Sequence, residues 1–120
     1  HKYYFSAENE VVLCGFFGKK LRIKPGQFGR ADPNGGTGGL ARWNVQLDGD
    51  EDGIPIAKFQ NTKTGKFLRI YNDGNTIDVG GGGGKWTRFK AKRTRGNNFK
   101  LESVELPGKY VAVRQKKVTV

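Results

Sequence analysis

One short motif, Gly-Lys-x-(Leu/Val)-x-(Ile/Val), occurs three times in this chain of 120 residues. The copies read GKKLRI from Gly18, GKFLRI from Gly65 and GKYVAV from Gly108. Copies of one motif that recur at intervals of roughly 40 to 50 residues indicate a repeated supersecondary unit. This repeat constrains the fold more than any other feature, because each copy needs an equivalent place in the structure.

A second element recurs between the Gly-Lys motifs, an aromatic residue followed two positions later by a small apolar one. Its copies are Phe5-Ser6-Ala7, Trp43-Asn44-Val45 and Phe89-Lys90-Ala91. Short apolar segments close the second and third units at Thr76–Val79 and Lys117–Val120, and a weaker match, Phe28–Ala31, holds the corresponding place in the first. We therefore predict one domain, residues 1–120, built from three units at about 1–40, 41–84 and 85–120.

The repeated segments are predicted to be β-strands. In LRI, FLRI and YVAV, apolar and polar residues alternate with the period of a half-buried strand. No stretch shows helical periodicity with caps, and turn signals such as Asn72-Asp73-Gly74 separate the strands. Four short strands in each of three units predict an all-β chain, a pseudo-threefold β-trefoil of about twelve strands with little or no helix.

The motif positions have specific roles in such a fold. The apolar residues are expected to form two layers of a shared core: Leu21, Leu68 and Val111, then Ile23, Ile70 and Val113. The motif glycines are expected to adopt positive φ angles or to pack against a close neighbour. The segment Tyr3–Ala7 is expected to pair beside Lys117–Val120, so that the two termini meet.

These elements resemble those of the fascin-like β-trefoils. The similar sequences are Gly65-Lys66-Phe67-Leu68 with Asn72-Asp73-Gly74-Asn75, and Ala41-Arg42-Trp43-Asn44-Val45 before a new unit. Fibroblast growth factors and interleukin-1-like cytokines share that fold. The resemblance implies a non-enzymatic module that binds actin filaments. The wider fold leaves open a secreted growth-factor-like or interleukin-1-like protein that binds heparan sulfate and a receptor, and a module that binds carbohydrate or nucleic acid.

The chain has 22 Lys and Arg residues against 11 Asp and Glu residues, for a net charge of +11. A surface of this charge attracts polyanions, so an acidic protein such as filamentous actin, a sulfated glycan and a nucleic acid are all candidate partners. Nucleic acid is the least favoured, because most aromatic residues have expected places in the core. No apolar run has the length that a membrane span requires, and none is expected.

The densest basic segment runs from Lys85 to Arg95 and forms the principal candidate site. If Phe89 and Ala91 face the core, the basic residues between them share the outward face at intervals of about 7 Å, which suits a row of anionic groups. Two smaller basic groups lie near the first and third Gly-Lys motifs. The residues predicted to bind an anionic partner are Lys85, Arg88, Lys90, Lys92, Arg93, Arg95, Lys19, Lys20, Arg22, Lys24, Arg114, Lys116 and Lys117.

Two further motifs are interpreted as turns. Asp48-Gly49-Asp50-Glu51-Asp52-Gly53 begins like an EF-hand calcium loop, but its twelfth position is Phe59, where a bidentate Glu is required. An acidic hairpin turn is therefore the preferred interpretation. The glycine run 80–84 before Lys85 lacks the spacing of a phosphate-binding P-loop, so we predict a flexible hairpin loop there.

Residues suited to catalysis are scarce. His1 is the only histidine, and Cys14 is the only cysteine and has no histidine near it in sequence. This pattern predicts neither nucleophilic catalysis nor a zinc site. A lone cysteine forms no internal disulfide, which favours a reducing compartment. We therefore predict a non-enzyme without metal or cofactor. The lone cysteine together with the fascin-like resemblance implies a location in the cytoplasm at the cytoskeleton, with secretion as the alternative.

Overall fold

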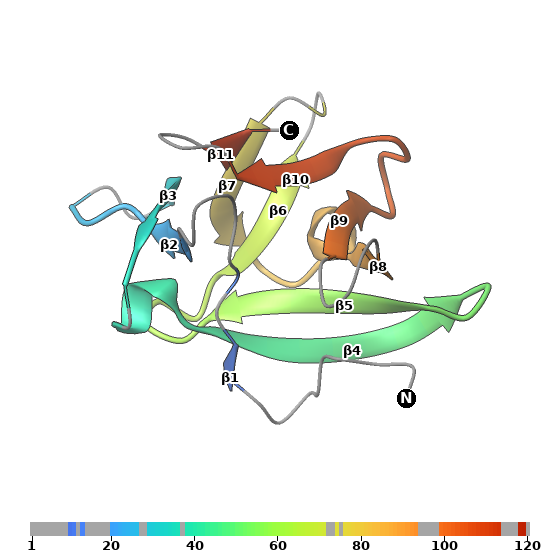
Figure 1. The fold of residues 1–120 in the computed structure, drawn as a ribbon, viewed down its shortest axis with the longest axis horizontal. Coiled ribbons are helices and arrows are strands. Elements are labelled where there is room, and N and C mark those ends of the chain that lie inside the picture. Colours follow the sequence, from blue (N-terminus) through green and yellow to red (C-terminus); the bar gives the residue numbers. More distant parts are fainter. Residues whose placement is uncertain are drawn as a thin grey trace.

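The computed structural model describes residues 10–11, 13, 20–26, 29–36, 38–71, 74, 76–93, 99–113 and 118–119. This part of the chain contains eleven strands, two short 3₁₀ turns and no α-helix, which confirms the predicted all-β class (Figure 1). The strands are β1 (Glu10–Val11), β2 (Lys20–Ile23), β3 (Ala31–Gly35), β4 (Trp43–Glu51), β5 (Ile54–Asn61), β6 (Phe67–Tyr71), β7 (Thr76–Gly81), β8 (Phe89–Arg93), β9 (Phe99–Ser103), β10 (Tyr110–Val113) and β11 (Val118–Thr119). The 3₁₀ turns are η2 (Gly39–Ala41) and η3 (Lys85–Thr87).

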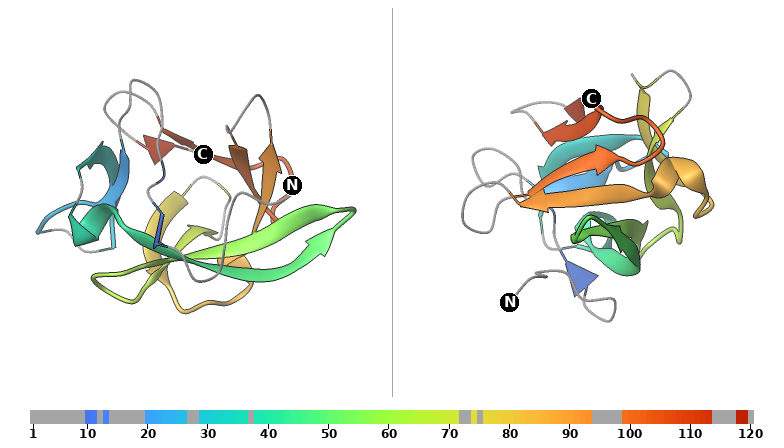
Figure 2. Two further views of the ribbon diagram at one scale, coloured as in Figure 1. Left: turned by 60° about the horizontal axis from the view of Figure 1, so that its bottom comes forward. Right: turned by 90° about the vertical axis from the view of Figure 1, so that its right-hand side faces the viewer.

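All of the strand pairs are antiparallel. One sheet follows the order β1-β4-β5-β8-β9-β10-β11, with β6 added to β5 and β7 to β6, and a second sheet consists of β2 and β3. The long hairpin β4–β5 runs along one side of the molecule (Figures 1 and 2), and the strands β3, β7 and β11 lie beside one another. Within the described residues, no helix is long and apolar enough to cross a membrane.

The hydrogen-bonding pattern repeats between the predicted units. Val11 pairs with Trp43 between β1 and β4, just as Ala57 pairs with Phe89 between β5 and β8. The amide of Asn61 donates to the carbonyl of Lys66 at 2.8 Å, and the amide of Ser103 donates to that of Lys109 at 2.9 Å. The two aromatic triplets and the turns that follow them therefore occupy equivalent positions.

The core contains the residues that the repeated motif places there. Leu21, Ile23, Leu68 and Ile70 are fully buried, and Val111 is half-buried against the same cluster; the side chain of Val113 is outside the described residues. Burying one Leu or Ile side chain contributes about 1.5–3 kcal/mol.

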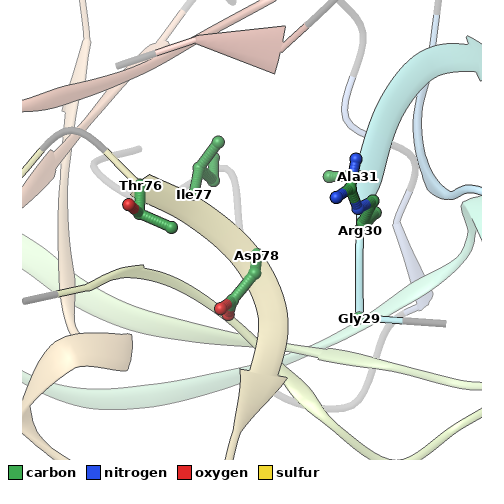
Figure 3. A pocket seen from close by; sticks show the side chains of 6 residues that line it. All are labelled: Gly29, Arg30, Ala31, Thr76, Ile77 and Asp78. Atoms are coloured by element: carbon green, nitrogen blue, oxygen red, sulfur yellow. The ribbon is translucent and has the colours of Figure 1, made fainter. Parts of the chain in front are cut away.

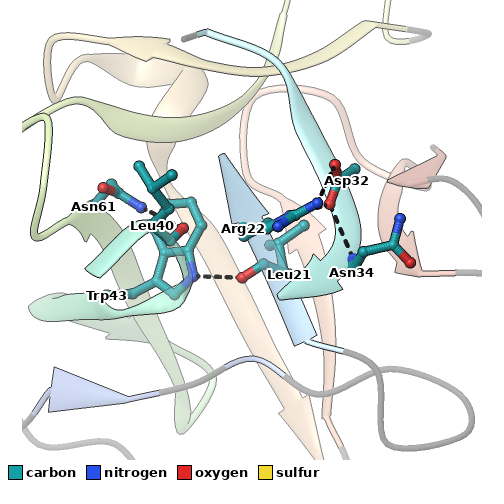
Figure 4. A network of polar contacts seen from close by, with 7 residues as sticks. All are labelled: Leu21, Arg22, Asp32, Asn34, Leu40, Trp43 and Asn61. Atoms are coloured by element: carbon teal, nitrogen blue, oxygen red, sulfur yellow. Dashed lines mark hydrogen bonds and ion pairs between the residues drawn. The ribbon is translucent and has the colours of Figure 1, made fainter. Parts of the chain in front are cut away.

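Two buried polar groups in this region have backbone partners, shown in Figure 4. The indole Nε1 of Trp43 donates to the Leu21 carbonyl at 3.2 Å. The amide Nδ2 of Asn61 donates to the Leu40 carbonyl at 3.0 Å. These bonds offset the cost of burying the two polar groups and join β2 and η2 to the hairpin β4–β5.

An arginine–aspartate pair recurs in the first and second units. Arg22 Nε lies 2.7 Å from Asp32 Oδ1 (Figure 4), and Arg69 Nε lies 2.7 Å from Asp78 Oδ1. Burial raises the pKa of Asp32, but the hydrogen bonds from Arg22 and the Asn34 amide, with the charge of Arg22, outweigh burial and lower the pKa below its ordinary value.

The Arg22–Asp32 pair shows that the prediction of a strand at Phe28–Ala31 as the counterpart of Thr76–Val79 was wrong. The segment that matches β7 is β3, Ala31–Gly35, because Asp32 and Asp78 each accept from an Arg on the preceding strand and from the backbone amide two residues later. β3 corresponds to β7 through an aspartate and not through apolar residues. A search for an apolar segment therefore placed the strand too early in the sequence. In the third unit, Ala112 and Thr119 are the paired positions.

Two of the motif glycines adopt a backbone conformation that other residues rarely adopt. Gly65 and Gly108 have φ angles of 76° and 89°, in the left-handed region that favours glycine. A Cβ atom at Gly108 would meet no atom within 4 Å, so conformation and not crowding is the requirement there. Gly18 and the predicted first strand Tyr3–Ala7 lie outside the described residues.

Candidate anion-binding site

Strand β8 and Arg88, the residue just before it, present the predicted basic row Arg88, Lys90 and Lys92 on their outward face. Phe89 and Ala91 are buried, whereas Arg88, Lys90 and Lys92 alternate with them and are half-buried. The strand pairs with β5 on one side and β9 on the other, so its outward residues have neighbours from both strands. The expected orientation of the row is thus confirmed.

Each cation of the row holds a carboxylate of the same chain. Arg88 Nε lies 2.7 Å from Asp48 Oδ2, and Lys90 Nζ lies 2.9 Å from Glu51 Oε1. Lys92 Nζ lies 2.6 Å from Glu102 Oε1 on β9. The row therefore accommodates carboxylates along its length, and this chain already supplies them.

Two of these carboxylates come from the tip of the hairpin β4–β5. Glu51 pairs with Ile54 across a two-residue turn in which Asp52 and Gly53 have φ angles of 54° and 80°. Positive φ at both central residues defines a type I′ turn, for which Asp-Gly is a favoured sequence. The predicted acidic hairpin turn is confirmed, and the hairpin brings Asp48 and Glu51 to β8. Among the described residues, no three His, Cys, Asp or Glu side chains are grouped so as to hold a metal ion.

The pair between Lys92 and Glu102 differs from the other two because its acid is buried. Glu102 is 6% exposed, and its Oε2 also accepts from the Gly108 amide at 2.7 Å. The hydrogen bonds from Lys92 and from Gly108 lower the pKa of Glu102, and the same bond to Glu102 raises the pKa of Lys92. Lys92 thus neutralises a buried acid, whereas Arg88 and Lys90 contact exposed ones.

Lys58, which the sequence pattern did not single out, connects the row to the glycine-rich segment before η3. Its Nζ donates to the Gly83 carbonyl at 2.7 Å and lies 3.9 Å from Asp48 Oδ2. Lys85 begins the predicted basic segment before the row; its side chain is 62% exposed, and its Nζ lies 3.6 Å from Glu105 Oε2. The alternation along β5 gives no sign of the contact between Lys58 and Gly83, because the two residues are 25 positions apart and are brought together by the fold.

Three of the other predicted basic residues lie on or next to strand β2 of the second sheet, away from β8 in the strand order. Arg22 is paired with Asp32 on the sheet β2–β3, where Lys20 is half-buried and Lys24 is exposed. The backbone of Arg93 ends β8, and its side chain is outside the described residues. The predicted residues outside the described chain are Lys19, Arg95, Arg114, Lys116 and Lys117. Binding of an anion by any of these groups stays a prediction.

A partly exposed aromatic pair, Tyr71 and the half-buried Trp86, lies next to the basic row, and sequence reasoning missed it. Tyr71 is 37% exposed, and its ring centroid lies 5.9 Å from that of Trp86 at an interplanar angle of 80°. Arg69 Cζ lies 3.9 Å from the Tyr71 centroid, and Lys85 Nζ lies 4.9 Å from that of Trp86. A comparison of the repeats could have found the pair, because the positions of Tyr71 and Trp86 are occupied in the first unit by Lys24 and Leu40, which are not aromatic.

A small pocket lies between β3 and β7 (Figure 3). It is lined by Gly29, Arg30, Ala31, Thr76, Ile77 and Asp78. The Val79 amide donates to the Gly29 carbonyl at 2.9 Å and joins the two walls. Because its single carboxylate already pairs with Arg69, this lining provides no acid and base pair for catalysis.

Comparisons with known proteins find solved structures of similar fold but assign the chain to no family. No family model and no curated protein matches the chain. Among solved structures, cytolethal distending toxin from Actinobacillus actinomycetemcomitans matches with a TM-score of 0.66 and 18% identity, over 94% of this chain and 79% of that one. The Haemophilus ducreyi toxin matches with a TM-score of 0.66 and 16% identity, over 99% and 77%. At these identities the likeness concerns the fold, and the resemblance to fascin-like proteins stays a prediction.

Proposed function

We propose that this chain is a non-enzymatic β-trefoil binding module. Three features support the trefoil: the motif repeated three times, the hydrogen bonds repeated between units, and the contact among β3, β7 and β11, one from each unit. Closing three such units on one another buries a shared core and removes most sheet edges. Binding is proposed rather than catalysis because the sequence has one histidine and one cysteine, which leaves little material for a nucleophile with its base.

The proposed partner is an acidic protein surface, such as that of filamentous actin. The observation that carries this proposal is the row on β8, in which the cations hold carboxylates at 2.6, 2.7 and 2.9 Å. Asp48 and Glu51 occupy the places that acidic side chains of a partner would take. Because both are exposed on a hairpin, a partner can displace them at little cost. The net charge of +11 adds long-range attraction to such a partner.

A sulfated glycan is the second candidate, because the same charge attracts sulfate groups. It would accompany a secreted, growth-factor-like role, whereas actin binding would accompany a cytoplasmic, cytoskeletal role. Carboxylates are the groups actually held by β8, and for this reason the acidic protein is preferred. Retention on heparin alone does not separate the two, since any chain of this charge binds heparin to some extent.

Co-sedimentation with filamentous actin at physiological salt tests the proposal. The variant Arg88→Gln/Lys90→Gln removes two cations of the row, and Lys63→Gln/Lys66→Gln removes two exposed cations of the turn between β5 and β6 as a control. We expect the first variant to lose about tenfold in affinity, from roughly 0.2–1 kcal/mol per exposed contact and the added repulsion of Asp48 and Glu51. Wild-type protein that stays in the supernatant, or an equal loss in both variants, would overturn the proposal.

A further inference from the structure

We propose that the Tyr71–Trp86 pair is the apolar anchor of this interface. It would take an apolar side chain that the acidic partner presents beside its carboxylates. This inference rests on the proposed function, and it adds the part of the interface that does not depend on charge.

Folding does not require an aromatic residue at either position. Tyr71 follows the last core residue of its Gly-Lys motif, and the same position in the first unit is Lys24. Trp86 is the middle residue of η3, and the middle residue of η2 is Leu40. The equivalent backbone of the first unit thus forms with a lysine and a leucine. A large aromatic surface kept partly exposed where the fold accepts Lys and Leu indicates a role in binding.

The pair has the composition and the rigidity of an interface hot spot. Trp, Tyr and Arg are the residues that most often carry binding energy at protein interfaces. The Tyr71 ring is held between the Arg69 guanidinium and Trp86. Arg69 is itself fixed by two hydrogen bonds to Asp78, at 2.7 and 3.3 Å. An anchor that is already ordered loses little conformational entropy when a partner binds.

The aromatic pair and the basic row form one continuous surface. Lys85 lies beside the Trp86 ring, and Arg88 is the residue that follows η3. Lys58 bridges the other side, since it contacts both the Gly83 carbonyl and Asp48, the partner of Arg88. A protein that places carboxylates on β8 therefore has the two rings within the same footprint.

The chemistry of the pair favours an acidic protein over nucleic acid or sugar. Proteins that bind single strands stack successive bases on aromatic faces. The two rings here meet at 80°, so they do not provide a pair of parallel faces for neighbouring bases. Lys85, which is largely exposed beside Trp86, complements a carboxylate next to an apolar side chain. Arg69 and Lys85 together give the rim of the anchor a positive charge.

The experiment compares variants that copy the first unit. Trp86→Leu and Tyr71→Lys/Trp86→Leu install residues that the equivalent backbone already accommodates, and thermal unfolding confirms that they fold. Leu47→Thr serves as the control, because Leu47 is the other exposed large apolar residue among those described. Binding is measured by co-sedimentation with filamentous actin at two salt concentrations and, separately, by affinity for heparin.

We expect the double variant to lose about 30-fold in actin affinity, although it gains a positive charge, and to keep the salt dependence of the wild type. Its affinity for heparin should not fall, and Leu47→Thr should bind actin like the wild type. Unchanged actin binding by the double variant, with binding still weakened by Arg88→Gln/Lys90→Gln, would refute the anchor and leave the proposed function standing. An equal loss in Leu47→Thr would refute it as well, and a loss of heparin binding would assign the rings to a sugar. Wild-type protein that does not bind actin would overturn both proposals.

Discussion

Neutralising Asp48 and Glu51 should strengthen binding to an acidic partner. In the free protein these carboxylates hold Arg88 and Lys90, so a partner must displace them before it can make the same contacts. Asp48→Asn/Glu51→Gln keeps the size and shape of both side chains and removes their charge. The cations of β8 then become available without competition.

The structure sets the size of the effect. The side chains of Asp48 and Glu51 are 44% and 49% exposed, so each pair is a surface ion pair and contributes about 0.2–1 kcal/mol. Releasing both pairs lowers the cost of binding by about 0.5–2 kcal/mol in total, which corresponds to about 2- to 30-fold tighter binding. The gain should shrink at high salt, where exposed charges are screened.

The matched control is Asp50→Asn/Asp52→Asn. It removes two charges from the same exposed hairpin, but neither residue forms an ion pair with a described basic side chain. Both variants therefore raise the net charge equally, and only the first frees the row on β8. Dissociation constants for filamentous actin, measured by co-sedimentation at low and physiological salt, give the comparison. Equal gains in the two variants, or no gain in the first, would show that the hairpin carboxylates do not compete for the site.

Three further predictions concern stability. Glu102→Gln should lower the free energy of unfolding at neutral pH by about 1–3 kcal/mol, measured by urea denaturation, because the ion pair with Lys92 is lost. The pKa of Glu102 is lowered in the folded state, so its contribution to stability is complete above its ordinary pKa of 4.5 and is lost as the pH falls through the folded value. The variant should lack this part of the acid dependence. Gly81→Ala should destabilise by about 1–3 kcal/mol, because its Cβ would lie 2.5 Å from a methyl group of η3, whereas Gly82→Ala, which meets no atom within 4 Å, should unfold like the wild type. Asp78→Asn should cost about 1–3 kcal/mol in the same assay by weakening the bonds to Arg69; an unchanged midpoint would show that this pair does not stabilise the fold.

The strands and the core could be predicted from the sequence because their signals are local. Alternation within five or six residues identifies Leu21, Ile23, Leu68 and Ile70 as buried, and all four are. The outward row on β8 follows from the same alternation. Such signals need no knowledge of which strand lies next to which.

The partners of the basic row could not be predicted, because they depend on strand register. Arg88 and Asp48 are 40 residues apart in the sequence, and the path of the hairpin β4–β5 brings them together. The aspartate that defines β3 was missed for the same reason, since Asp32 is recognised only by its bond to Arg22.

The glycine run 80–84 shows a different limit. Composition predicted a flexible hairpin loop, whereas Gly80 and Gly81 end β7 and only three residues separate this strand from η3. At Gly81 the absence of a side chain allows close packing against η3, and Gly83 has a φ angle of 95°. Glycine is thus required at one position by close packing and at the other by a positive φ angle. Composition alone does not distinguish these two requirements from a flexible loop.

The difference between the repeated units bears on how many partners the domain could engage through the proposed anchor. The first unit has the backbone positions of the aromatic pair, filled by Lys24 and Leu40. Introducing Lys24→Tyr and Leu40→Trp would place a second anchor on another side of the same small domain. If the anchor binds filaments as proposed, each anchor would hold one filament, and a domain with two anchors would join two neighbouring filaments. Two side chains on this scaffold would then separate these two modes of binding.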